Sequence, residues 1–97
     1  SIKGTIMSHF KMGDLVEFIP ENFDYPMWKV RLIGVGYVEN ITATVGSDGK
    51  TYKIYYVYCG KVIKQQMKNF VEIEVKDQTF ELVEYEMEKV CRKLNSN

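Results

Sequence analysis

Several residue types are scarce in this 97-residue chain, and each scarcity argues against a class of protein. Histidine occurs once, at His9, with no cysteine or carboxylate at ligand spacing, so neither a metal site nor a histidine-based catalytic centre is indicated. The two cysteines, Cys59 and Cys91, lack CxxC spacing. We expect two reduced, partly buried thiols rather than a disulfide framework. No apolar run approaches the roughly 20 residues that span a bilayer, so no membrane association is expected.

A net charge is also missing, because 13 basic residues balance 13 acidic ones. The chain as a whole therefore has no electrostatic bias toward nucleic acid or anionic membranes, although a local basic face remains open. The sequence has no basic stretch followed by an apolar leader, which favours a cytoplasmic protein. Its length and a hydrophobic content of 45% predict a small single globular domain.

Alternating apolar and polar residues predict a series of short strands. Pro20 ends the first strand, because proline has no N–H to donate to a ladder. The aromatic loop over 21–27 is expected to be ordered and to pack on the sheet. Gly34 and Gly36 indicate a sharp bend rather than a phosphate loop, because no helix follows them. The five expected strands span residues 15–19, 28–35, 37–45, 50–59 and 62–67, and residues 71–75 are expected to complete the sheet.

Turn residues separate the later strands. Gly46-Ser47-Asp48-Gly49 predicts a hairpin loop, since Asp-Gly supplies the positive φ that such turns require. Gly60 is expected to turn the chain again, and Asn69-Phe70 indicates one tight turn before the last strand.

From Asp77 the apolar residues recur at every third or fourth position, which predicts an amphipathic helix of about 17 residues with Asp77 as its N-cap. A strand over Phe80–Tyr85 is not expected, because Val83 breaks the alternation. The helix is predicted to cover its own sheet or, alternatively, to pair with a second copy of the chain. Its predicted apolar stripe consists of Phe80, Val83, Met87, Val90 and Leu94.

The sequence pattern divides the chain into three parts. Residues 1–12 form an N-terminal segment with no clear period, in which Met7 and Met12 are both candidates for the natural start. Residues 13–76 form the β-rich domain, and residues 77–97 form the helix and a frayed tail.

The β-rich part is similar to SH3-like barrels of the Tudor and KOW type. The similarity rests on the Gly-Asp-x-Val pattern at 13–16, the bend at 34–38, the aromatic strand at 52–56 and the Phe70-Val71 closure. It implies a mainly β, five-stranded SH3-like barrel, to which the C-terminal α-helix is appended. Because such folds carry many functions, the resemblance implies a fold rather than an activity.

A basic, tyrosine-rich stretch is the first candidate binding surface. Between Lys50 and Val71 the chain has five lysines, four tyrosines and no acidic residue. Lysines pair with phosphates and tyrosine rings can stack on bases, although both residue types are also ordinary in strands and at sheet edges. Many KOW-type domains contact RNA or the transcription and translation machinery. The candidate nucleic-acid residues, RNA or DNA, are Lys29, Arg31, Lys53, Tyr55, Lys61 and Lys64.

Protein recognition is the alternative function, as an adaptor or inhibitor of a larger complex. One candidate surface is the aromatic loop, and the other is an exposed pair on the far side of the helix that could also support a homodimer. The candidate protein-binding residues are Phe23, Tyr25, Trp28, Leu82 and Tyr85. An aromatic cage for methylated side chains, of the kind Tudor domains carry, could in addition use Tyr37 and Tyr55.

Catalysis is not indicated. The sequence has no serine or cysteine nucleophile beside a histidine, no metal-ligand spacing and no nucleotide-binding loop. We therefore expect a non-enzymatic binding module without cofactor or metal, either monomeric or dimeric through its helix.

Overall fold

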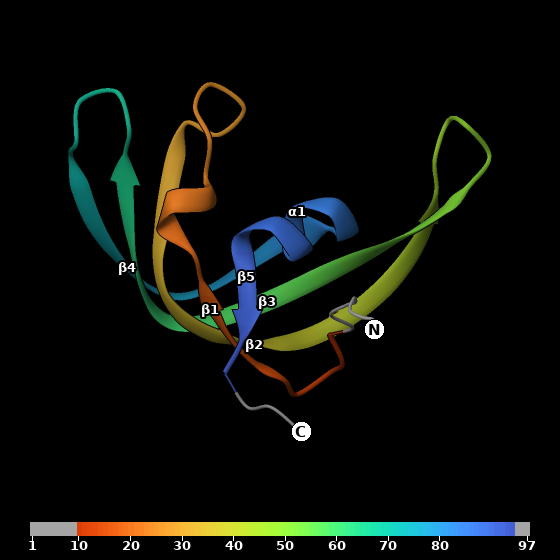
Figure 1. Cartoon of the computed structure of the whole chain (residues 1–97). Helices are drawn as coiled ribbons and strands as arrows, with labels where there is room; N and C mark the ends of the chain where they lie inside the picture. Colours follow the sequence, from red (N-terminus) through yellow and green to blue (C-terminus); the bar gives the residue numbers. More distant parts are fainter. Residues whose placement is uncertain (1–9, 95–97) are drawn as a thin grey trace, which may run out of the picture.

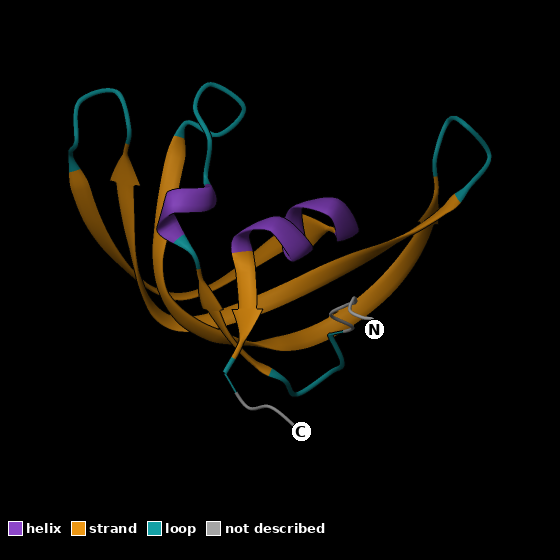
Figure 2. Ribbon diagram, viewed as in Figure 1, coloured by secondary structure: helices purple, strands orange, loops and turns teal. Residues whose placement is uncertain are grey.

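A computed structural model describes residues 10–94, which form one strongly bent antiparallel sheet and a short C-terminal helix (Figures 1 and 2). The sheet order is β4-β3-β2-β1-β5, so the first four strands follow one another as neighbours and the fifth returns to the edge of β1. The elements are β1 (Leu15–Phe18), η1 (Pro20–Asn22), β2 (Val30–Val45), β3 (Thr51–Gln66), β4 (Glu72–Val83), α1 (Glu84–Val90) and β5 (Cys91–Lys93).

The expected mainly β composition with five strands and a C-terminal helix is confirmed, but the chain divides into strands differently. β2 continues through Gly34 and Gly36, and its pairing with β3 shifts register between Gly34 and Tyr37. The glycines therefore bend one strand instead of separating two. Gly60 likewise lies inside β3, so the expectation of a turn there is wrong. Bulges permit this because an extra residue increases local twist without ending the ladder.

The long helix expected from Asp77 is also wrong. β4 extends to Val83, and α1 covers only seven residues. Phe80 and Leu82 alternate toward the core because β4 pairs with β3, with Tyr55 opposite Leu82. Over so few residues, the apolar positions fit both the two-residue period of a strand and the three- to four-residue period of a helix. The pairing of β4 with β3 therefore decides which of the two forms. The expected domain boundary between residues 76 and 77 consequently falls inside β4.

The end of the described chain forms a strand instead of a last helical turn. Cys91 pairs with Phe18 across β5 and β1, and Leu94 is exposed although it was expected in the apolar stripe. Two other members of that stripe, Met87 and Val90, are buried against the sheet of the same chain. The helix therefore docks within its own chain, as the first of the two alternatives predicts.

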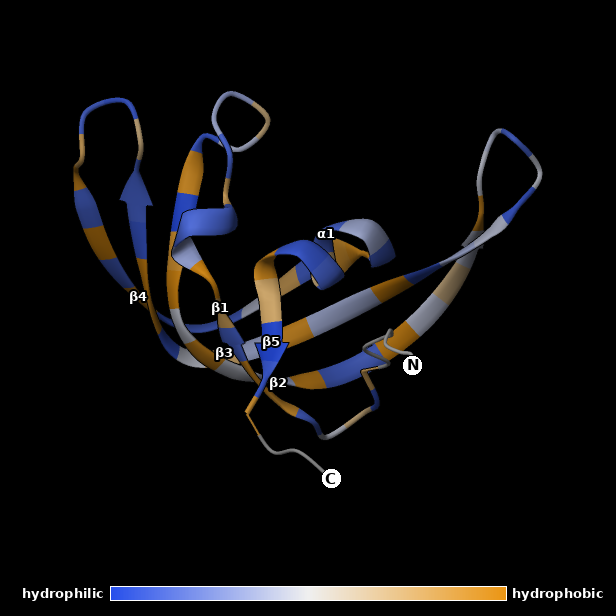
Figure 3. Ribbon diagram, viewed as in Figure 1, coloured by the Kyte–Doolittle hydropathy of each residue, from blue (hydrophilic) through white to orange (hydrophobic). Residues whose placement is uncertain are grey.

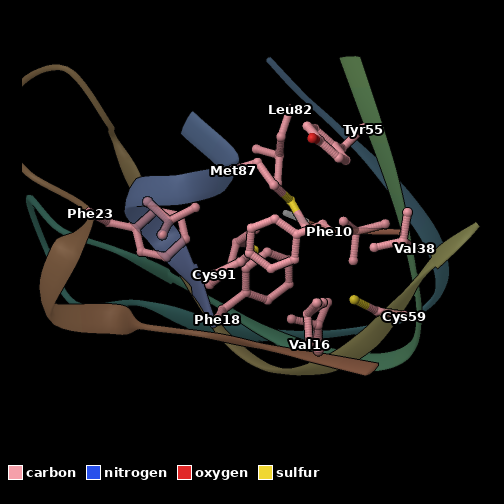
Figure 4. Close-up of a cluster of buried hydrophobic side chains, with 14 residues drawn as sticks. Phe10, Val16, Phe18, Phe23, Val38, Tyr55, Cys59, Leu82, Met87 and Cys91 are labelled. Carbon is pink, nitrogen blue, oxygen red and sulfur yellow. The ribbon is translucent and has the colours of Figure 1, made fainter. Parts of the chain in front are cut away.

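The core lies on the inner side of the bend, where α1 and η1 cover the sheet (Figures 2 and 4). Apolar and polar residues alternate along the strands in Figure 3, which gives β2, β3 and β4 one buried and one solvated face. Phe10 belongs to this core, and its ring meets that of Tyr55 edge to face at 5.9 Å. The rest of the expected N-terminal segment, up to residue 9, lies outside the described residues. The buried residues are Phe10, Val16, Phe18, Phe23, Leu32, Val38, Tyr55, Val57, Cys59, Val62, Leu82, Met87, Val90 and Cys91.

Replacing Gly36 with alanine should destabilise the fold. A Cβ atom at Gly36 would overlap the carbonyl oxygen of Tyr58 and lie 2.7 Å from the Sγ atom of Cys59, so β2 and β3 would have to move apart. We expect the free energy of unfolding to fall by about 1–3 kcal/mol, the usual cost of overpacking. Gly60→Ala is the matched control, because no atom lies within 4 Å of the Cβ position there. Urea unfolding that shows equal stability for both variants would contradict this account of the bend.

Candidate functional site: a basic and aromatic loop end

Two loops meet at one end of the bent sheet, where they enclose two hollows. The first loop connects η1 to β2 and the second connects β3 to β4, and the backbone N–H of Met67 donates to the carbonyl of Lys29 at 3.2 Å (Figure 1). The hollows have volumes of about 210 and 380 Å³ and share Tyr25 and Lys68. The smaller is lined by Tyr25, Lys29, Val30, Gln66 and Lys68, and the larger by Tyr25, Arg31, Met67, Lys68 and Phe70.

The first loop is held by its buried aromatic residues. Phe23 is buried and meets the rings of Trp28 and Phe18 edge to face, at 4.9 and 6.1 Å. Tyr25 lies between these anchors but stays 53% exposed, with the Nζ atom of Lys29 5.5 Å from its ring centroid. This cation–π contact and the packed anchors present the Tyr25 ring at the rim of both hollows.

The second loop places Phe70 in an unusual backbone conformation. Its φ is 59°, in the left-handed region, and its side chain is 69% exposed. The N–H of Phe70 donates to the carbonyl of Gln66 at 2.7 Å, which closes the tight turn expected at Asn69-Phe70. Glycine or asparagine is the usual residue at positive φ, and a bulky side chain there costs about 1–2 kcal/mol. An exposed ring is thus maintained at a position where the fold alone favours a smaller residue.

Three cations surround the hollows, namely Lys29, Arg31 and Lys68. Among the described residues that line either hollow, none carries a carboxylate. The Nη1 atom of Arg31 donates to the Oε1 atom of Gln65 at 3.2 Å, whereas its Nε atom is buried without a hydrogen-bond partner in the described part of the chain. A buried guanidinium N–H without an acceptor is costly.

The predicted nucleic-acid residues do not form one surface. Lys29 and Arg31 lie at the loop end, but Lys61 pairs with Glu74 at 3.4 Å. Lys64 lies over the ring of Phe80, 5.7 Å from its centroid. Lys53 lies in the β2–β3 hairpin, whose 46–50 loop is at the opposite end of the sheet (Figure 1).

Tyr55 is not available to stack on a base, because it is only 1% exposed. Its ring belongs to the core, and burial is the main cause that raises the pKa of its hydroxyl. The same burial removes Tyr55 from any aromatic cage. At the loop end, an aromatic ring and a cation come instead from Phe70 and Lys68. Lys68 was counted in the basic stretch, but neither residue was among the candidate site residues. An aromatic residue in a tight polar turn was the sequence signal that could have identified Phe70.

Some of the predicted protein-binding residues are also buried, and others are exposed. Leu82 is 3% exposed, so the expectation of an exposed Leu82 and Tyr85 pair is wrong. Leu82 lies in β4 instead of on the far side of a helix, and it packs inward. Tyr85 is 59% exposed on α1, while Phe23 and Trp28 serve as packing anchors for the loop that presents Tyr25.

Carboxylates from β2 and β4 flank the tyrosines on the outer face of the sheet. The hydroxyl of Tyr58 donates to the Oδ1 atom of Asp77 at 2.5 Å, and this hydrogen bond is the main cause that raises the pKa of Tyr58. Tyr37 packs against Tyr58 with ring centroids 5.6 Å apart, and Glu39 lies close enough to accept from Thr79 at 3.3 Å. Residues 50–71 contain no acidic residue, but in the folded chain carboxylates from neighbouring strands lie beside their tyrosines.

The described residues contain neither a candidate metal site nor a helix that could span a membrane. Within 10–94, no group of three or more His, Cys, Asp or Glu side chains is placed to hold a metal ion, and His9 lies outside this range. No helix of residues 10–94 is long and apolar enough to cross a membrane.

The two thiols should be unreactive in the folded protein. Burial raises the pKa of Cys59 to about 11, and burial followed by the nearby Cys59 raises that of Cys91 to about 12. Because the thiolate is the reactive form, on the order of one thiol in a thousand or fewer should be ionised at pH 8. A thiol reagent should therefore label neither cysteine in the native protein and both in denaturant. Rapid labelling of the folded chain at pH 8 would contradict this burial.

No protein-family model, curated protein or solved structure matches this chain. The choice of a ligand for the loop end therefore depends on its geometry and charge.

Proposed function

We propose that this chain is a non-enzymatic nucleic-acid-binding module with an SH3-like barrel fold, and that it binds at the loop end formed by Tyr25, Lys29, Arg31, Lys68 and Phe70. The single observation that carries the proposal is the gathering of three cations and two exposed rings around hollows with no carboxylate in their described lining. Cations supply affinity for phosphates, and rings supply a stacking surface for bases.

The fold assignment has its own support. Four strands follow one another in the sheet, β5 pairs with the far side of β1, and a short helix precedes β5. The Tudor and KOW type of barrel likewise has a one-turn helix before its last strand. In this chain α1 takes that position, whereas the sequence pattern suggested Asn69-Phe70.

The charges at the loop end favour an anionic ligand over a cationic one. A methylated lysine in an aromatic cage would lie beside Lys29, Arg31 and Lys68, and like charges repel. Asp24, next to Tyr25 in the chain, is already paired with Lys89 at 2.7 Å, which reduces its attraction for a cationic ligand. Phosphates therefore suit the loop end better than ammonium groups do.

A protein partner at the same end is the second candidate. Met27, Val71 and Ile73 are exposed near the hollows, by 66%, 47% and 51% respectively. A protein partner would need these residues to form one contiguous apolar patch. Binding to such a surface should depend only weakly on salt, whereas binding through phosphates should weaken steeply as salt is added.

A salt titration of single-stranded oligonucleotide binding tests the proposal. Three cation–phosphate contacts predict that the logarithm of the association constant falls with the logarithm of salt concentration with a slope of about −2, at roughly 0.7 per contact. Lys68→Ala should weaken binding and reduce the slope to about −1.4. The measurement is fluorescence anisotropy of labelled mixed-sequence oligonucleotides.

Lys53→Ala is the matched control, because Lys53 is an exposed lysine in the hairpin arm away from the loop end. It should leave both affinity and slope unchanged. No binding at about 50 mM salt, or binding without a salt slope, would reject the proposed function. An equal loss of slope in both variants would show that binding uses the strand surface instead.

A further inference from the structure

We propose that the larger hollow holds one unstacked nucleobase between Tyr25 and Phe70, so that the module selects single-stranded over double-stranded nucleic acid. This inference rests on the proposed function, because it assigns the part of the ligand that enters the hollow. It adds a mode of recognition that cations alone cannot provide, since phosphates are present in single strands and duplexes alike.

The lining of the larger hollow matches a base with its attached phosphate. The two rings and the thioether of Met67 supply apolar contacts, while Arg31 and Lys68 supply charge in the same space of about 380 Å³. Flat aromatic rings and the planar guanidinium group both stack on bases, and unpaired bases are the ones that aromatic side chains reach. A base in a duplex is already stacked and paired, so it must leave the helix before it can enter.

The conformation of Phe70 is an independent indication of a role in binding. Its backbone lies in the left-handed region, and its ring is 69% exposed, so the ring contributes little to the core. Bulky residues in this region occur mostly where the surrounding structure holds them for a purpose, and ligand clamps are among those places. The other non-glycine residue with positive φ in the described chain is Asp77, whose carboxylate accepts a hydrogen bond from the hydroxyl of Tyr58. No described aromatic ring packs against the ring of Phe70.

Arg31 links the base site to the phosphates. Its Nη1 atom is fixed by Gln65, and Gln65 is fixed in turn by Glu72 at 2.8 Å. The buried Nε atom has no partner among the described residues and belongs to a side chain that lines the hollow. An oxygen of a nucleotide bound in the hollow can pair with the charge of this guanidinium group. Lys68 lines both hollows, so the same side chain can follow the backbone from one nucleotide to the next.

The test compares three ligands of equal length: single-stranded oligo-dT or oligo-U, a DNA duplex, and a chain of abasic deoxyribose phosphates. The variants are Phe70→Gly and Tyr25→Leu. Glycine adopts a φ near 59° without steric cost, so Phe70→Gly should remain folded, as circular dichroism and the urea midpoint will show. Tyr85→Leu is the control, because it removes a tyrosine that is 59% exposed on α1 and lines neither hollow.

We expect wild type to bind the single strand more tightly than the duplex or the abasic chain. Each variant should weaken single-strand binding by roughly 5- to 150-fold, the effect of losing one stacked base, and leave the salt slope unchanged because the cations remain. Binding of the variants to the single strand should then resemble that of wild type to the abasic chain. Tyr85→Leu should bind as wild type does.

Two results would overturn the inference, and they can be told apart. If wild type binds all three ligands equally, with the expected salt slope and no effect of either variant, phosphate binding stands but the base site does not exist. If wild type binds none of the ligands, the proposed function fails, and the base site fails with it.

Discussion

The close approach of β2 and β3 at Gly36 is the constraint on which the other features depend. The two backbones lie so near each other there that a Cβ atom would overlap the carbonyl oxygen of Tyr58. This contact and the adjacent register shift bend both long strands around one inner face. The bend lets α1 and η1 pack on the concave face of the sheet (Figure 2). It also makes the two ends of the long strands point in different directions. The loops at one of these ends form the candidate site.

Strand pairing also decides where positive charge is available. β4 brings Glu74 to within 3.4 Å of Lys61 and Asp77 to within hydrogen-bonding distance of Tyr58. Exposed ion pairs of this kind contribute little to stability, but they reduce the attraction of the surrounding surface for phosphates. The pairing with β4 ends at Gln65, and the loop beyond it carries Lys68 without such a partner among the lining residues. The pairing with β4 thus reduces the positive charge at Lys61 but not at Lys68.

How much the sequence could predict depended on how local the determining interactions are. The aromatic loop and the turns at Gly46–Gly49 and Asn69-Phe70 follow from neighbouring residues, and their prediction was sound. The extent of β4 depended on pairing with β3, so Phe80 and Val83 could be read as helical until the partner strand was known. The site shows the same division. Lys29 and Arg31 were candidates for nucleic-acid binding and Tyr25 for protein binding because of their residue types. Phe70 and Lys68 come from a loop that only the bend brings beside them.

The pairing of β5 with β1 joins residues that are far apart in the chain, such as Val16 and Lys93. Contacts between distant residues form late, because a long loop of chain must first be ordered, and folds that contain many of them form slowly. During synthesis β1 can pair with β2 long before Cys91 has been made, but the edge of β1 stays open until then. A ribosome-bound chain would therefore expose this edge and the inner face of the sheet until residue 93 emerges. Such unpaired edges are where nascent chains associate wrongly, so the last short strand serves to protect the first.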